Sequence, residues 1–493
     1  MEKKSTPNIK TNFIYQFMYQ ILTMILPLIT APYIARVLGA ENVGVYAYTY
    51  AIVNYFVIFA MLGLTNHGSR VIAKAKGNPD ELNSAYSNLL ALHVLITLLV
   101  ICVYFGFLFV SNVGYTPIFL IQSVFLVAAL LDVSWLFFGL EKFRITVVRN
   151  AIIKVCTVFA VFYFVRTKDD LWKYTLIMAL GMLLSQSVIW LYVKRYVRFV
   201  KPQMSIMLKH VKPLIALFVA IMATSIFRSL GKVMLGSMSS MVQVGCFENA
   251  DKLIMFPVAL INALATVMLP RMASVFASGE VKKAERYILS TMEFSLTMGA
   301  AFAFGMAGIA DKFAVVFFGE EFRLTGSILS GMAVTILLMA FNSVIRTQYI
   351  IPKSKDHIYI RAVCGGAVIN VVLNFILIPH LASTGAVIGT NAAYLFIFIY
   401  QTIAVRKDLP IRKYFKIAIP PLLIGTLMYG IVCWIGLVTD TNVLGVVLQI
   451  SGGIVVFSIV TCIYAAYQKN SILHHTVIKL FRLFGLVQKS NNR

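Results

Sequence analysis

The residues of this chain best placed to do chemistry are charged side chains that interrupt long apolar runs. Five of them fall close together in the sequence: Arg228, Lys232, Glu248, Asp251 and Lys252. The first two are four residues apart, so a helix would place both side chains on one face. A charge within a membrane costs about 2.5–3.5 kcal/mol, and it therefore usually faces other helices or a water-filled cavity. Two interpretations stay open: a basic site for an anionic headgroup, and a structural network that neutralises itself.

Further polar residues inside apolar runs add to this set. We expect Asp132 and Lys154, both toward the side predicted to be cytoplasmic, to form a structural ion pair. Asn12, Gln16 and Gln20 recur every four residues, which predicts a polar stripe along one helix. Because amides that face lipid are costly, the stripe should line a cavity or bond to another helix. The candidates for substrate binding are Arg228, Lys232, Lys252, Asn12, Gln16 and Gln20, and those for coupling or charge pairing are Glu248, Asp251, Asp132 and Lys154.

No signature of enzymatic chemistry accompanies these residues. The sequence contains neither a GxxxxGK[ST] loop for nucleotide phosphates nor an HExxH zinc motif. Its six cysteines lie within or at the edges of apolar runs, without the spacing of metal ligands. We therefore predict no catalytic residue, no metal and no cofactor. Coupling to H⁺, to Na⁺ or to the membrane potential stays open.

The elements that must position these residues are about fourteen apolar runs. Most of them are near the ~20 residues with which a helix crosses a bilayer. The runs are 11–34, 44–66, 85–111, 114–139, 148–165, 171–193, 213–236, 245–270, 288–310, 324–350, 358–379, 381–404, 415–437 and 443–466. Hydrophobic residues make up 60% of the 493 residues and charged residues only 13%, which excludes an ordinary water-soluble fold. We predict an all-α integral membrane protein.

The basic residues predict how the chain is oriented in the membrane. Most of the 43 Lys and Arg residues fall in alternate gaps between the runs, together with both tails. By the positive-inside rule these gaps and both termini are cytoplasmic. The formal charge of +24 is spread over short clusters at the ends of runs, which fits anionic lipid headgroups and not a nucleic-acid surface.

A short internal repeat predicts two related halves. Leu38-Gly39 precedes Val43-Gly44, and Leu235-Gly236 precedes Val244-Gly245. Six spans per copy would insert both copies the same way up. We expect two six-helix lobes around a central cavity, with two additional spans and a surface-bound amphipathic tail. The predicted divisions are 1–200, 201–410, 411–467 and 468–493.

The order of several motifs resembles a known family. They are Pro32-Tyr33-Ile34-Ala35-Arg36-Val37-Leu38-Gly39, Val43-Gly44-Val45-Tyr46, Leu62-Gly63-Leu64 to Arg70, Gly139-Leu140-Glu141-Lys142-Phe143, Arg149-Asn150, Glu248-Asn249-Ala250-Asp251-Lys252, Leu269-Pro270-Arg271-Met272, Asn370, Asn374 and Ile378-Pro379. Over most of 12–404 the chain resembles polysaccharide repeat-unit flippases of the Wzx type, in the MOP exporter superfamily. It departs from them at Gly231 and Tyr394, near which the family often has acidic residues.

The resemblance implies a bacterial cytoplasmic-membrane protein that carries undecaprenyl-pyrophosphate-linked oligosaccharide to the outer leaflet for capsule, O-antigen or exopolysaccharide. Its partners would be that lipid, the membrane lipids and polysaccharide polymerase machinery, and no nucleic acid. One alternative is a cation-coupled multidrug or small-molecule antiporter, which should present acids to cationic drugs. Within the runs, however, basic residues outnumber the acids Asp132, Glu248 and Asp251. A peptidoglycan lipid precursor flippase also fits. A membrane glycosyltransferase usually needs an outer loop or domain to hold its acceptor, and the gaps between the runs of this chain are too short for one.

Overall fold

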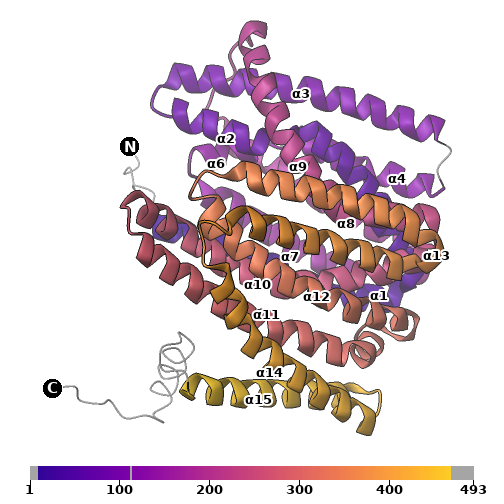
Figure 1. Cartoon of the computed structure of the whole chain (residues 1–493). Helices are drawn as coiled ribbons and strands as arrows, with labels where there is room; N and C mark the ends of the chain where they lie inside the picture. Colours follow the sequence, from indigo (N-terminus) through magenta and orange to yellow (C-terminus); the bar gives the residue numbers. More distant parts are fainter. Residues whose placement is uncertain (1–8, 112–113, 468–493) are drawn as a thin grey trace. The chain divides into compact units, whose positions relative to one another are not determined.

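The structure of the chain is a computed structural model that describes residues 9–111 and 114–467 (Figure 1). Side chains are described within these ranges except at 9–17, 19, 220, 223, 227 and 228. All regular elements of the described residues are helices, which confirms the prediction of an all-α integral membrane fold. The amphipathic tail expected over 468–493 lies outside the described residues.

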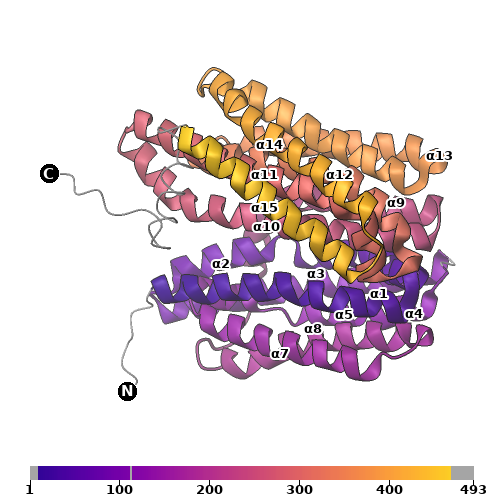
Figure 2. The same cartoon turned by 90° about the horizontal axis from the view of Figure 1, so that it is seen from below.

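The chain divides into two compact units at Gly245, and the first unit contains nine α-helices. They are α1 (Ile9–Met61), α2 (Leu64–Ala75), α3 (Pro79–Val110), α4 (Thr116–Gln122), α5 (Val124–Leu130), α6 (Ser134–Gly139), α7 (Phe143–Phe164), α8 (Leu171–Val193) and α9 (Met204–Met238). A short 3₁₀ helix, η1 (Lys168–Asp170), precedes α8. Within this unit α7 packs against both α1 and α8 (Figure 2).

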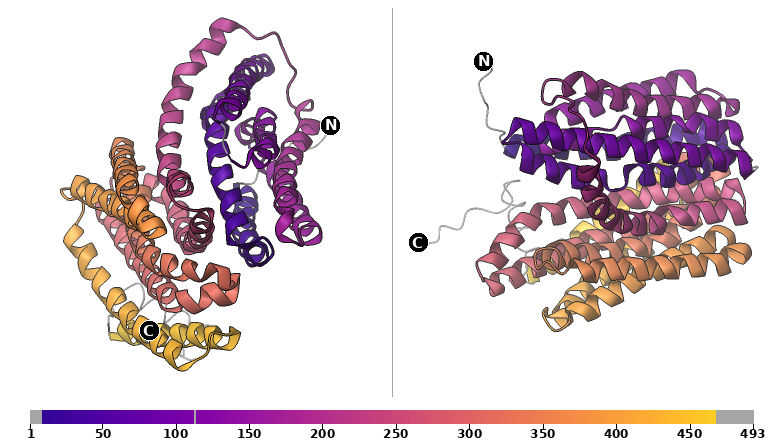
Figure 3. Two further views of the ribbon diagram at one scale, coloured as in Figure 1. Left: turned by 90° about the vertical axis from the view of Figure 1, so that its right-hand side faces the viewer. Right: turned by 90° about the horizontal axis from the view of Figure 1, so that it is seen from above.

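The second unit begins within α10 (Met241–Ala277). Its other helices are α11 (Val281–Phe318), α12 (Arg323–Ile345), α13 (Asp356–Val405), α14 (Ile411–Val438) and α15 (Val443–Tyr467), with the 3₁₀ helix η2 (Glu320–Phe322) and the π-helix η3 (Arg346–Ile350). Here α11 packs against α12, α14 and α15 (Figure 3). The four-part division expected from the sequence stays a prediction.

Twelve helices of the described residues are long and apolar enough to cross a membrane, two fewer than the apolar runs. Two long helices contain a non-helical residue: α1 at Gly39 (φ 80°, ψ 169°) and α13 at Ala382 (φ 48°, ψ −127°). Glycine adopts a positive φ without the steric cost of a Cβ. Helix α1 therefore holds the two runs 11–34 and 44–66, and α13 holds the two runs 358–379 and 381–404. The number of spans stays a prediction.

The outer surface of the helices is apolar, as a lipid solvent requires. Large side chains such as Leu423 and Leu437 on α14 and Leu444 on α15 are exposed. Between membrane helices there is little hydrophobic driving force, so close packing and interhelical hydrogen bonds hold them together. In the second unit the Thr335 hydroxyl donates to Asn391 Oδ1 at 2.6 Å, which joins α12 to α13.

In the first unit α2 packs closely against α6 through two glycines. A Cβ at Gly68 would lie 2.9 Å from the Trp135 ring, and a Cβ at Gly139 would lie 2.6 Å from Ile72 Cβ. Trp135 and Ile72 are both fully buried. Close packing of this kind places α2 firmly within the unit, and α2 in turn contacts α9.

Candidate functional site

The candidate site in the first unit lies where α9 packs against α1. Tyr48 and Tyr55 are seven residues apart on α1, which is about two helical turns. The Tyr48 hydroxyl is 3.3 Å from the Ser237 hydroxyl on α9. A Cβ at Gly236 would come within 2.3 Å of the Tyr48 ring, so only a glycine allows this approach. The tyrosine face of α1 therefore lies against α9.

The same face brings a basic group and a buried hydroxyl into electrostatic range. The Lys232 ammonium on α9 acts through space on the Tyr55 phenol. The Tyr55 hydroxyl is buried and has no hydrogen-bond partner among the described side chains and backbone. An ammonium and a phenol are both hydrogen-bond donors, and phosphate oxygens accept from both. We call Lys232, Tyr55, Tyr48 and Ser237 the α9 site.

Arg228 lies on α9 one turn before Lys232, as the sequence spacing predicts. Its side chain is outside the described ones. The same is true of Asn12 and Gln16 on α1, whereas Gln20 is exposed. Whether the polar stripe of α1 lines a cavity stays a prediction.

In the second unit the structure brings together two of the predicted charges. Lys252 Nζ lies 3.1 Å from Glu248 Oε1, one turn away on α10. The Glu248 side chain is 17% exposed and that of Lys252 is 34% exposed. An ion pair of this geometry offers an anionic ligand little net charge. Asp251 lies beside them on α10 and is partly buried.

Asp132 lies in the break between α5 and α6. Its Oδ1 atom accepts a hydrogen bond of 2.8 Å from the Ser134 backbone N–H, at the start of α6. Carboxylates satisfy the free N–H groups at helix starts in this way. Lys154 lies on α7 with an exposed side chain. A pairing of Asp132 with Lys154 stays a prediction.

The structure contains two buried charges that the sequence analysis did not treat as candidates. Glu293 on α11 is 8% exposed, and it is a further acid inside an apolar run. Arg149 on α7 is 7% exposed, and its Nε and Nη2 atoms donate to Asn150 Oδ1 at 3.1 and 2.7 Å. Ser185 on α8 donates to the same oxygen at 2.6 Å. A full count of charges within the runs would have found both residues.

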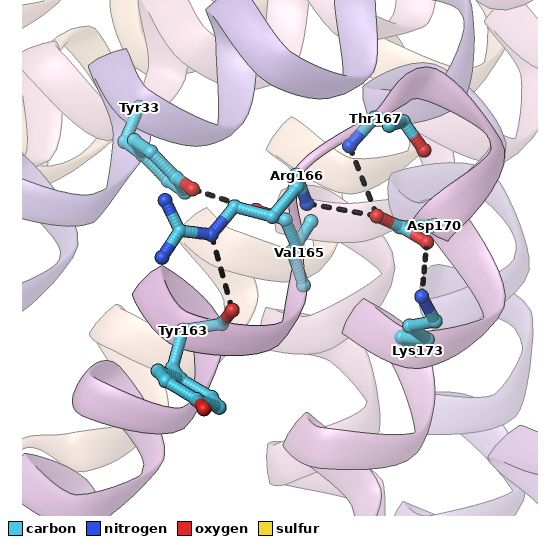
Figure 4. A network of polar contacts seen from close by, with 7 residues as sticks. All are labelled: Tyr33, Tyr163, Val165, Arg166, Thr167, Asp170 and Lys173. Atoms are coloured by element: carbon cyan, nitrogen blue, oxygen red, sulfur yellow. Dashed lines mark hydrogen bonds and ion pairs between the residues drawn. The ribbon is translucent and has the colours of Figure 1, made fainter.

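A polar network joins the turn between α7 and α8 to α1 (Figure 4). Asp170 accepts hydrogen bonds from the backbone N–H groups of Arg166 and Thr167, at 2.8 and 2.9 Å, and pairs with Lys173 at 2.7 Å. The Tyr33 hydroxyl of α1 donates to the Val165 carbonyl at 2.6 Å. These bonds satisfy the backbone of the turn, so we interpret the network as structural.

Metal-binding geometry does not occur in the part of the chain that the structure describes. No group of three or more His, Cys, Asp or Glu side chains there could hold a metal ion. All six cysteines are free. The twelve long apolar helices of the described residues, with a few buried donors and charges between them, define a polytopic membrane protein.

Comparison with known proteins identifies the family of the chain. The polysaccharide biosynthesis protein family matches residues 9–276, which is more than half of the chain. The chain belongs to this family, and its resemblance to Wzx-type flippases of the MOP superfamily is confirmed. A relative from Shigella dysenteriae named "Putative O-antigen transporter" is 24% identical over 403 residues, which are 80% of this chain and 100% of the relative.

Two groups of solved structures share the fold. A structure of the lipid II flippase MurJ in an inward closed conformation has a TM-score of 0.75 at 16% identity, over 93% of this chain and 100% of that one. An inward-facing multidrug resistance MATE transporter of the MOP superfamily has a TM-score of 0.61 at 16% identity, over 79% of this chain and 96% of that one. At such identities the likeness concerns the fold alone.

Proposed function

We propose that this chain moves undecaprenyl-pyrophosphate-linked oligosaccharide from the inner to the outer leaflet of the bacterial cytoplasmic membrane, for surface polysaccharide. Family membership supports a role in polysaccharide biosynthesis. The observation that carries the proposal is the packing of α9, which carries Lys232, on the tyrosine face of α1. There the Tyr48 hydroxyl meets Ser237 at 3.3 Å, and the Tyr55 hydroxyl is buried without a hydrogen-bond partner among the described residues. The Lys232 ammonium and the Tyr55 hydroxyl are both donors for phosphate oxygens at a place where most side chains are apolar.

The physical problem that such a protein must solve is desolvation. A diphosphate and sugar hydroxyls lose their water in hydrocarbon, at a cost of several kcal/mol for each group that stays without a hydrogen bond. A polar, basic path between helices replaces that water, while the polyprenyl chain stays in lipid. An anion that leaves an inside-negative cell also gains about 2.3 kcal/mol per charge per 100 mV. We propose alternating access of the two lobes, with Arg228 and Lys232 holding the phosphates.

The test is translocation by the purified full-length protein in proteoliposomes. A fluorescent oligosaccharide on undecaprenyl diphosphate is placed in one leaflet, and its exposure on the other leaflet is followed over time. We expect faster translocation than in protein-free liposomes, and a further increase with a membrane potential that favours anion movement in that direction. No acceleration with several oligosaccharides, together with proton-driven efflux of a small cation, would replace the flippase by an antiporter.

Variants locate the site within this assay. Arg228→Gln with Lys232→Gln should slow translocation by about tenfold or more, which corresponds to roughly 1.4 kcal/mol of lost phosphate binding. Lys194→Gln with Lys201→Gln removes the same charge from the exposed segment between α8 and α9, and should leave the rate nearly unchanged. Equal rates for the two double variants would show that the phosphates bind elsewhere.

A further inference from the structure

Two histidines from separate helices of the first unit form a contact to which the proposed function assigns no role. His67 lies on α2 and His210 near the start of α9. His67 Nε2 is 3.0 Å from His210 Nδ1, and the rings meet edge to face with their centroids 5.1 Å apart. Both side chains are half-buried. The distance is that of a hydrogen bond between two imidazoles.

The backbone around the pair brings α2 and α9 close together. The chain turns into α2 at Gly63, which has a φ of 76°. A Cβ there would lie 3.0 Å from Leu217 Cβ on α9. On α1, one turn before Gly63, the Phe59 ring packs against the Phe218 ring of α9 with the ring centroids 4.9 Å apart. The histidines therefore form the polar part of a close contact between α2 and the first half of α9.

This hydrogen bond depends on the charge of the two rings. One nitrogen must carry a proton and the other a lone pair, which is possible when at least one ring is neutral. When both rings are protonated, both facing nitrogens carry hydrogens and the two positive charges repel each other. An isolated histidine changes charge near pH ~6.5, within the range that cells experience.

The charged groups around the pair are all basic. Arg70 and Lys74 of α2 act on His67 together with His210. Lys209 and Lys212 flank His210 on α9. Among the described residues packed against α2, α6 has no titratable side chain, and the acids that begin α3, Asp80 and Glu81, are not among the groups that act on either imidazole. Among the described residues, therefore, no carboxylate acts on either imidazole to hold a doubly protonated pair together.

We propose that His67 and His210 form a proton-binding site that fastens α9 to α2 while at least one ring is neutral, and releases it when both are protonated. Its ligand is the proton, taken from the side of the membrane on which the pair lies, which we predict to be cytoplasmic. A role for this contact in transport rests on the proposed function, because α9 also carries Lys232, which is proposed to bind the phosphates. The contact itself does not depend on that function.

A spin-label distance measurement tests the site without any substrate. The six free cysteines are replaced by Ser in the full chain, and labels are attached through Asn66→Cys on α2 and Lys209→Cys on α9, both exposed positions. We expect the distance distribution to shift to longer values between pH 8 and pH 5, with a midpoint at or below pH ~6.5. His67→Gln with His210→Gln should abolish the shift, because an amide pair can form a hydrogen bond but does not titrate.

His357→Gln is the matched control, since it removes an exposed histidine of the second unit and should leave the shift unchanged. A distribution that does not change with pH in the starting protein would overturn the proposal. The same shift in the double glutamine variant would also overturn it. Since no lipid-linked sugar is present, neither result depends on whether the chain is a flippase.

Discussion

The two units hold neighbouring segments together with different chemistry at the side predicted to be cytoplasmic. In the first unit the contact between α2 and α9 is a pair of imidazoles, His67 and His210, 3.0 Å apart. In the second unit Lys355, just before α13, pairs with Asp408, just after it, at 2.7 Å. The Lys355 ammonium also donates to the Tyr349 hydroxyl at 3.1 Å. One contact contains no acid, and the other is an ion pair.

The two contacts should respond differently to pH. The hydrogen bond from Lys355 holds the pKa of Asp408 below its usual range, and the same bond raises the pKa of Lys355. A lowered carboxylate pKa contributes stability that is lost only as the pH falls through it, below ~4. A raised lysine pKa contributes stability that is lost only as the pH rises through it, above ~10.4. The ion pair is therefore constant between pH 5 and 8, where the imidazole pair is not.

The contrast indicates that the Lys355–Asp408 contact of the second unit is permanent and that the α2–α9 contact of the first unit is conditional. A fixed ion pair suits a part of the protein that keeps its shape. A titratable contact suits a helix that must move, and α9 is the helix that carries Lys232. Three predictions test this difference.

The largest expected effect is loss of the packing that positions α2. Gly139→Ala places a Cβ 2.6 Å from Ile72 Cβ and 2.7 Å from the Ser69 carbonyl oxygen, so α2 or α6 must shift. Overpacking of this kind costs about 1–3 kcal/mol. Thermal unfolding in detergent should show a lower Tm. Gly106→Ala on α3, with no atom within 4 Å of the new Cβ, should leave the Tm unchanged or slightly raised.

The second effect is the pH dependence of stability. Protonation of both rings breaks the α2–α9 contact, so stability should fall as the pH goes from 7.5 to 5.5 in the unsubstituted protein. We expect about 1 kcal/mol of this fall to disappear in His67→Gln with His210→Gln. Denaturation followed at both pH values measures it. An unchanged pH dependence in the double variant would contradict the assigned difference between the units.

The smallest effect is expected at the ion pair. The Lys355 and Asp408 side chains are 35% and 42% exposed, so solvent screens much of their attraction. Lys355→Gln should cost about 0.2–1 kcal/mol. The loss should be the same at pH 5.5 and pH 7.5, because both partners keep their charge throughout. A loss that varies over this range would mean that the second unit is also pH-sensitive.

Periodicity and hydropathy predicted the helices well, because each apolar run must satisfy its backbone within itself when it lies in lipid. They did not predict where helices break. Span 4 divides into three short helices, and Asp132, expected in an ion pair, meets the backbone N–H of Ser134 at such a break. The run 358–379 continues into the run 381–404 within one helix, with a single non-helical residue at Ala382.

Contacts between distant segments could not be predicted from the sequence, for a different reason. His67 and His210 are 143 residues apart, and neither stands out in its own helix. In the sequence Tyr55 is an ordinary aromatic residue of an apolar run, and only the packing of α9 against α1 brings it within range of Lys232. Charge inside a run is visible in a sequence, as for Lys232, but the partner of that charge follows only from the packing of helices.

Recognition of the phosphates is tested by comparing two lipids in the same proteoliposomes. One carries the oligosaccharide on undecaprenyl diphosphate, and the other carries the same oligosaccharide on an uncharged polyprenyl linker. We expect the diphosphate lipid to be translocated at least about tenfold faster, and Lys232→Gln to remove most of this preference. Equal rates for the two lipids in the unsubstituted protein would contradict recognition of the phosphates by a basic site.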